Sequence, residues 1–137
     1  MHIDGSLMWE WQLSESEVSE AHQHADRVTL HLSAVTARAL GAQPGEAPSA
    51  WGYAQGVILD LHQAQVQQWD GFAAGRIAQG RLTQDGQPLL SIPLPVVRMV
   101  PNHLELRFAN GAVLELTAQA WQCRFGGEAR FRESYAC

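Results

Sequence analysis

The sequence contains no lysine, and its nine basic side chains are all arginines, spread from Arg27 to Arg132. This absence excludes reactions that require a lysine amine, such as Schiff-base formation, the phosphate-binding loop and the Ser-x-x-Lys catalytic pair. No basic cluster is present either, and the net charge is −5. Nucleic-acid-binding proteins normally carry a clustered basic surface. We therefore expect no nucleic-acid partner.

Cysteines and long apolar runs are scarce as well. Cys123 and Cys137 are the only cysteines, and their spacing fits neither a Cys-x-x-Cys motif nor a disulfide framework. No stretch approaches the roughly 18 apolar residues of a membrane-spanning helix. The N-terminus lacks the basic start and apolar core of a secretory signal. These absences predict reduced thiols, a cytoplasmic location and no membrane partner.

Charged residues make up only 17% of the chain, whereas 46% of its residues are hydrophobic. This composition is typical of an ordered globular protein. The 137 residues correspond to one domain, residues 1–137. A chain of about this size buries enough surface to fold without a disulfide or a metal. We expect no cofactor.

Apolar and polar residues alternate with a period of two along most of the chain, which is typical of half-buried strands. The segments with strand signals are 7–13, 28–34, 51–62 with a bend at Gly56, 73–83, 104–108, 114–118, 121–125 and 129–137. The segment 88–94 is either an edge strand or an extended run outside the ladder, because Pro88, Pro93 and Pro95 limit its pairing. Asp85-Gly86 predicts a tight hairpin, and Gly126-Gly127 predicts a turn between the last two segments. The Asp-Gly and Asn-Gly hairpins make most pairing antiparallel, because parallel strands would need crossover segments that the sequence does not show. We predict a mainly β fold, an antiparallel β-sandwich or a partly closed barrel of about seven or eight strands.

One short N-terminal helix completes this prediction. Ser14 and Glu17 match a capping box, in which the serine caps the helix and the glutamate is its third residue. Leu13 and Val18 match the hydrophobic staple that accompanies such a start. The pattern predicts a helix within residues 14–25.

The segment 104–118 predicts its own strand register. A two-residue Asn110-Gly111 loop would place Leu106 opposite a glutamate, whereas a three-residue loop from Ala109 places it opposite Leu114. Cross-strand neighbours share a face of the sheet, so the second register is favoured. Gly111 then takes the left-handed position of a bulged turn.

The six histidines include one close pair, His22 and His24. At a helix end, residues two apart diverge, and a closed zinc site needs four ligands. We therefore predict no metal site.

Four residues are candidates for binding a ligand or partner: Trp51, Tyr53, Asp60 and His62. Trp51 and Tyr53 follow the longest irregular segment, 37–50, and amphipathic aromatics at a strand end can line a pocket or an interface. Asp60 and His62 lie two apart on the polar face of a strand, as a carboxylate that orients an imidazole would. No serine lies in a Gly-x-Ser-x-Gly motif, so we assign no catalytic residue.

Three function hypotheses follow. The first is a non-enzymatic binding or protein-interaction domain, in the manner of an antitoxin or immunity protein whose carboxylates face a basic partner. The second is a small-molecule-binding barrel with its mouth near Trp51, Tyr53 and the 37–50 loop. The third is a hydrolase whose site is assembled only in space.

Overall fold

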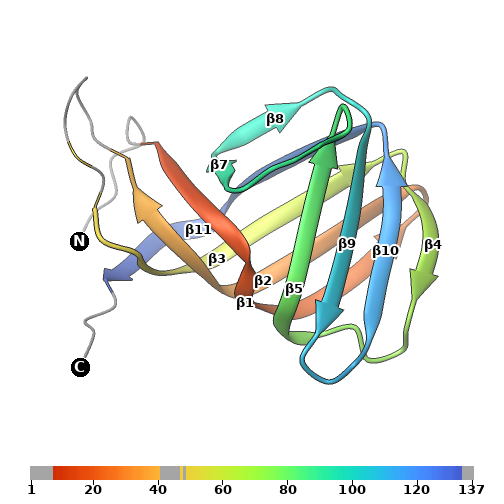
Figure 1. Cartoon of the computed structure of the whole chain (residues 1–137), viewed down its shortest axis with the longest axis horizontal. Coiled ribbons are helices and arrows are strands. Elements are labelled where there is room, and N and C mark those ends of the chain that lie inside the picture. Colours follow the sequence, from red (N-terminus) through yellow and green to blue (C-terminus); the bar gives the residue numbers. More distant parts are fainter. Residues whose placement is uncertain (1–7, 41–46, 48, 134–137) are drawn as a thin grey trace.

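The computed structural model describes residues 8–40, 47 and 49–133, and these form eleven strands and no helix (Figure 1). The strands are β1 (Trp9–His24), β2 (Arg27–Ala39), β3 (Gly52–His62), β4 (Gln65–Trp69), β5 (Gly75–Gln84), β6 (Gln87–Pro88), β7 (Ile92–Leu94), β8 (Val96–Arg98), β9 (Asn102–Phe108), β10 (Val113–Ala118) and β11 (Ala120–Glu133). The mainly β class is confirmed. The predicted strand number is too low, because short strands such as β4, β7 and β8 carry too few residues to show a periodic pattern.

The strands form one antiparallel sheet that does not close into a barrel. Its order is β4-β10-β9-β5-β1-β2-β3-β11-β8, with β6 paired to β5 and β7 paired to β1. In Figure 1 the strands β5, β9, β10 and β4 run steeply across the diagonal strands β2, β3 and β11. Side chains from both groups belong to one hydrophobic core. The indole of Trp121 on β11 also donates a hydrogen bond of 3.2 Å to the side chain of Gln84 on β5. None of the described segments is a helix able to cross a bilayer.

The predicted helix within residues 14–25 is wrong, because β1 continues through this segment as an irregular strand. Bulges interrupt its pairing with β2 between Gln12 and Glu20, and Glu15 adopts a positive φ of 67°. Ser16 is fully buried, donates a hydrogen bond of 2.5 Å to the Gln12 carbonyl and accepts one of 3.1 Å from the Thr36 amide.

The capping box is not formed. Instead, the Glu17 carboxylate accepts a hydrogen bond from the Ser33 hydroxyl of β2. A short segment with a thin apolar stripe gains little as an isolated helix, so pairing with β2 decides its structure.

The hairpin prediction is confirmed in detail. Leu106 pairs with Leu114 and Leu104 pairs with Leu116, and all four side chains are fully buried. Gly111 has a φ of +91°, as the bulged three-residue loop requires. The local alternation and the turn residues were therefore sufficient to specify this register.

The predicted bend at Gly56 is also present. Gly56 has a φ of +74°, and the buried positions of β3 change parity there, from Ala54 before the bend to Val57 after it. The sequence pattern grouped Tyr53 with the later core residues, but the change of parity turns this side chain outward.

The predicted turn at Gly126-Gly127 is wrong. β11 runs through both glycines and pairs with β3 on either side, with an irregular register between Phe125 and Arg130. Two glycines indicate a turn from the local sequence alone, but a long partner strand accommodates them as an irregularity within a strand. Leu7 and residues 134–137, which belong to two of the predicted strands, lie outside the described residues, and so does Cys137.

Candidate binding surface around Phe72

The connection from β4 to β5 passes across the loop that joins β9 and β10. Asp70 links this connection to Val113, the first residue of β10. The Asp70 amide donates to the Val113 carbonyl at 3.0 Å, and the Asp70 carboxylate accepts from the Val113 amide at 2.8 Å. The Ala73 amide closes the turn by donating to the Asp70 carbonyl at 3.1 Å. The connection is therefore held at defined points.

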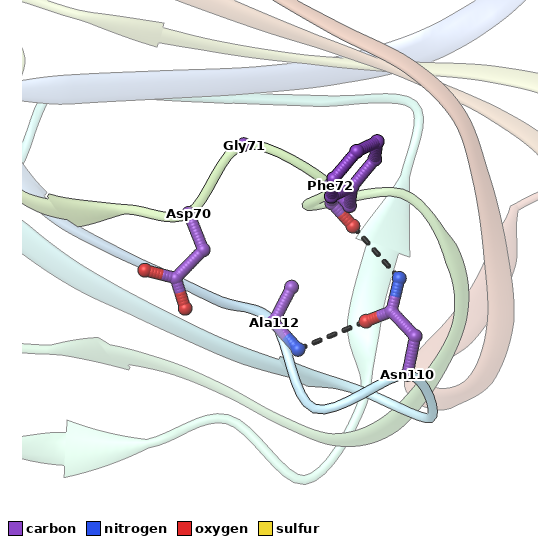
Figure 2. A pocket seen from close by; sticks show the side chains of 5 residues that line it. All are labelled: Asp70, Gly71, Phe72, Asn110 and Ala112. Carbon is purple, nitrogen blue, oxygen red and sulfur yellow. Dashed lines mark hydrogen bonds between the residues drawn. The ribbon is translucent and has the colours of Figure 1, made fainter.

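Asn110 provides a second link. Its Nδ2 donates to the Phe72 carbonyl at 2.8 Å, and its Oδ1 accepts from the Ala112 amide at 2.9 Å (Figure 2). The sequence predicted Asn110 as a turn residue of its own hairpin. The structure shows that it also ties this hairpin to the β4–β5 connection, and no sequence signal indicated that contact.

Phe72 projects from this anchored connection into solvent. The residue is 83% exposed, and Figure 2 shows its ring pointing away from Asn110, which binds the Phe72 carbonyl. A large aromatic side chain in water forgoes the stabilisation of burial. A single exposed phenylalanine does not define a site, so the surroundings of Phe72 decide whether it is a candidate.

Two hollows adjoin Phe72, and their lining residues are called the Phe72 surface below. The smaller hollow has a volume of about 360 Å³ and is lined by Asp70, Gly71, Phe72, Asn110 and Ala112. The larger has a volume of about 530 Å³ and is lined by Ser19, Glu20 and Ala21 of β1 together with Trp69, Gly71, Phe72, Ala73, Ala74, Gly75 and Asn110. The second hollow therefore places aromatic and small side chains beside the edge of β1.

That edge of β1 is unpaired over residues 19–24. β5 pairs with β1 only at Glu17 and Val18, and no other strand among the described residues continues this ladder on the side away from β2. An unpaired strand edge presents backbone donors and acceptors that can pair with another chain. The Phe72 surface thus combines an open strand edge with an exposed aromatic side chain.

The predicted site residues Trp51 and Tyr53 lie elsewhere. Trp51 is half-buried beneath the guanidinium of Arg38, whose carbon is 4.6 Å from the centre of the indole ring, and Arg38 also pairs with Glu10. Tyr53 is 47% exposed on β3. The guanidinium of Arg38 therefore covers one face of the Trp51 indole in a cation–π contact. Of the adjoining loop, residues 41–46 and 48 lie outside the described residues.

Asp60 is buried at the centre of a polar network. Its carboxylate accepts hydrogen bonds from Thr29 at 2.6 Å and Gln122 at 3.3 Å, and it lies 3.8 Å from Arg27 and 4.0 Å from Arg124. Burial alone raises the pKa of this carboxyl, but the hydrogen bonds and the two arginines outweigh burial and hold the pKa below its usual value.

His62 is not among the described partners of this carboxylate, so the expected Asp60–His62 pair is not formed. The neighbours of Asp60 come from two strands, β2 and β11, which flank β3 in the sheet, and only the sheet order brings them together. Through these contacts the Asp60 carboxylate connects side chains of β2 and β11 across β3.

The four candidates do not form one site. Tyr53 and Asp60 are seven positions apart on β3, which corresponds to as much as about 23 Å along a strand. The hydrophobic core of the described residues contains the fully buried side chains of Trp9, Trp11 and Trp121.

Comparisons of this chain with protein-family models, with curated proteins and with solved structures found no match.

Proposed function

We propose that this chain is a non-enzymatic protein-interaction domain that binds an extended segment of a partner polypeptide at the Phe72 surface. The observation that carries the proposal is the position of Phe72, which is exposed on an anchored turn beside the unpaired edge of β1. An added strand would pair its backbone with residues 19–24, and its side chains would contact Phe72 and Trp69.

The charge of the surface favours a basic partner. Glu20 lines the larger hollow with 65% of its side chain exposed, and the whole chain carries a net charge of −5. Complementary charge contributes mainly to specificity and to the rate of association. We propose a partner segment that alternates apolar and basic residues, which agrees with an antitoxin-like or immunity-like role in the cytoplasm.

The architecture that supports this role is sandwich-like. The two groups of strands share one core, which leaves their outer faces and free edges for contacts with other molecules. An interior filled with large apolar side chains favours a binding surface over a binding cavity.

A displayed library of random peptides, selected against the full chain, tests the proposal. We expect selected peptides to lose binding to the Phe72→Ala variant and to retain it with Leu90→Ala. Leu90 is a matched control because it is 90% exposed and does not line either hollow.

Amide hydrogen exchange on the complex reports the mode of binding. Strand addition should slow the exchange of amides within residues 19–24, because they gain hydrogen-bond partners. Peptides that bind Phe72→Ala as well as the parent, or that leave these amides unprotected, would overturn the proposal.

A further inference from the structure

A cluster of three potential metal ligands lies on the outer face of the β1–β2 hairpin. Glu20 and His22 are two positions apart on β1, so their side chains project to the same side of the sheet. His31 on β2 pairs directly with Glu20. The prediction of no metal site assumed that His22 stands at a helix end, and the strand removes that reason.

The three side chains already lie close together. Their ligand atoms are all within 4.8 Å of one another, and His22 Nδ1 is 3.6 Å from a carboxylate oxygen of Glu20. The rings of His22 and His31 have centroids 5.3 Å apart. Neighbouring ligands of a tetrahedral zinc ion lie about 3.3 Å apart, given bonds of about 2.0–2.1 Å. Small side-chain rotations would therefore bring the three groups to ligand distances.

The surroundings leave these side chains room to rotate. Glu20 and His22 are 65% and 47% exposed, and their described ion pair is with each other. Arg27 and Arg124 form their described ion pairs with the buried carboxylate of Asp60. The cluster therefore combines two imidazoles and one carboxylate, and no arginine of the described residues forms an ion pair with its glutamate.

We infer that Glu20, His22 and His31 form a binding site for a divalent transition metal of the zinc type. Two histidines and one glutamate are a ligand set that zinc uses when a fourth position stays open to water or to another ligand. Because Glu20 also lines the larger hollow, the metal would lie at the border of the Phe72 surface. The inference itself does not depend on the proposed partner.

Calorimetric titration of the full, chelator-treated chain with zinc chloride tests the site. We expect one zinc ion per chain, and we expect His22→Gln and His31→Gln each to weaken binding more than about tenfold, since even groups behind the ligands typically contribute that much. The control is His103→Gln. His103 lies 2.7 Å from Glu115, so it offers one imidazole and one carboxylate but no third ligand in the described cluster.

Two further readouts make the result specific. The side-chain NMR signals of His22 and His31 should shift on zinc addition while that of His103 stays in place, and circular dichroism should show that every variant keeps its strand signal. Absence of zinc binding, or equal binding by His22→Gln and His103→Gln, would overturn the inference. The titration uses no partner, so its failure would leave the proposed interaction untouched.

Discussion

Three glycine-to-alanine substitutions should separate the cost of steric overlap between strands from the cost of backbone strain in a turn. At Gly80 on β5, an added Cβ would lie 2.5 Å from the Cβ of Leu13 and 3.2 Å from a methyl group of Leu106. The Leu13 Cβ is attached directly to the backbone of β1, so it cannot rotate away. Gly80→Ala must therefore separate β1 from β5, and we expect a loss of roughly 1–3 kcal/mol of unfolding free energy through overpacking.

The other two glycines are the comparisons. A Cβ added at Gly111 would meet no atom within 4 Å, but the residue has a φ of +91°, so Gly111→Ala should cost about 1–2 kcal/mol through backbone strain alone. Gly71 has neither a close neighbour nor a positive φ. Gly71→Ala should change stability by less than about 1 kcal/mol, in the stabilising direction.

Urea unfolding of the parent and the three variants, followed by tryptophan fluorescence, measures these differences. The slopes of free energy against urea should agree, because each variant exposes the same surface on unfolding. If Gly80→Ala were as stable as Gly71→Ala, then Leu13 would not lie against β5. The strand assignment of the segment that resembles a helix start would then be wrong.

Three further outcomes are expected. Ser16→Ala should lower the unfolding free energy by about 1–3 kcal/mol, measured by urea, because it leaves the Thr36 amide without its acceptor, whereas Ser14→Ala should have almost no effect. The reverse order would support a helix that begins at Ser14. Asp60→Asn should destabilise the protein at pH 7, where the ionised carboxylate is stabilised by its neighbours. The pKa of Asp60 is lower in the folded chain than its usual value of 3.8, so the stability that the carboxylate contributes should be lost as the pH falls below 3.8 and through the folded pKa. A difference in unfolding free energy between parent and variant that stayed constant from pH 7 to pH 3 would contradict the polar network. Burial raises the pKa of the Cys123 thiol to about 12, so iodoacetamide should label Cys123 only after unfolding. Rapid labelling of Cys123 in the native chain, detected by peptide mass mapping, would be inconsistent with that burial.

The candidate sites were only partly predictable from the sequence. The sequence pattern named Asp60 as a candidate binding residue, but its partners Thr29 and Gln122 lie 31 and 62 positions away. Phe72 was not selected, because an isolated aromatic residue in a turn gives no signal of its exposure. His22 was paired with His24 in sequence, whereas the structure pairs its ring with that of His31.

The sequence by itself determined the features that act over a few residues. The period-two alternation specifies the β class, and the leucines around Asn110-Gly111 fix the register of β9 and β10. Turn chemistry and side-chain alternation are local, so they leave a readable pattern. Tertiary structure alone decided that the capping-box segment is a bulged strand and that β11 runs through Gly126. In both places a long partner strand pairs with the residues on either side of the segment, and this pairing outweighs the weak local preference of the segment itself.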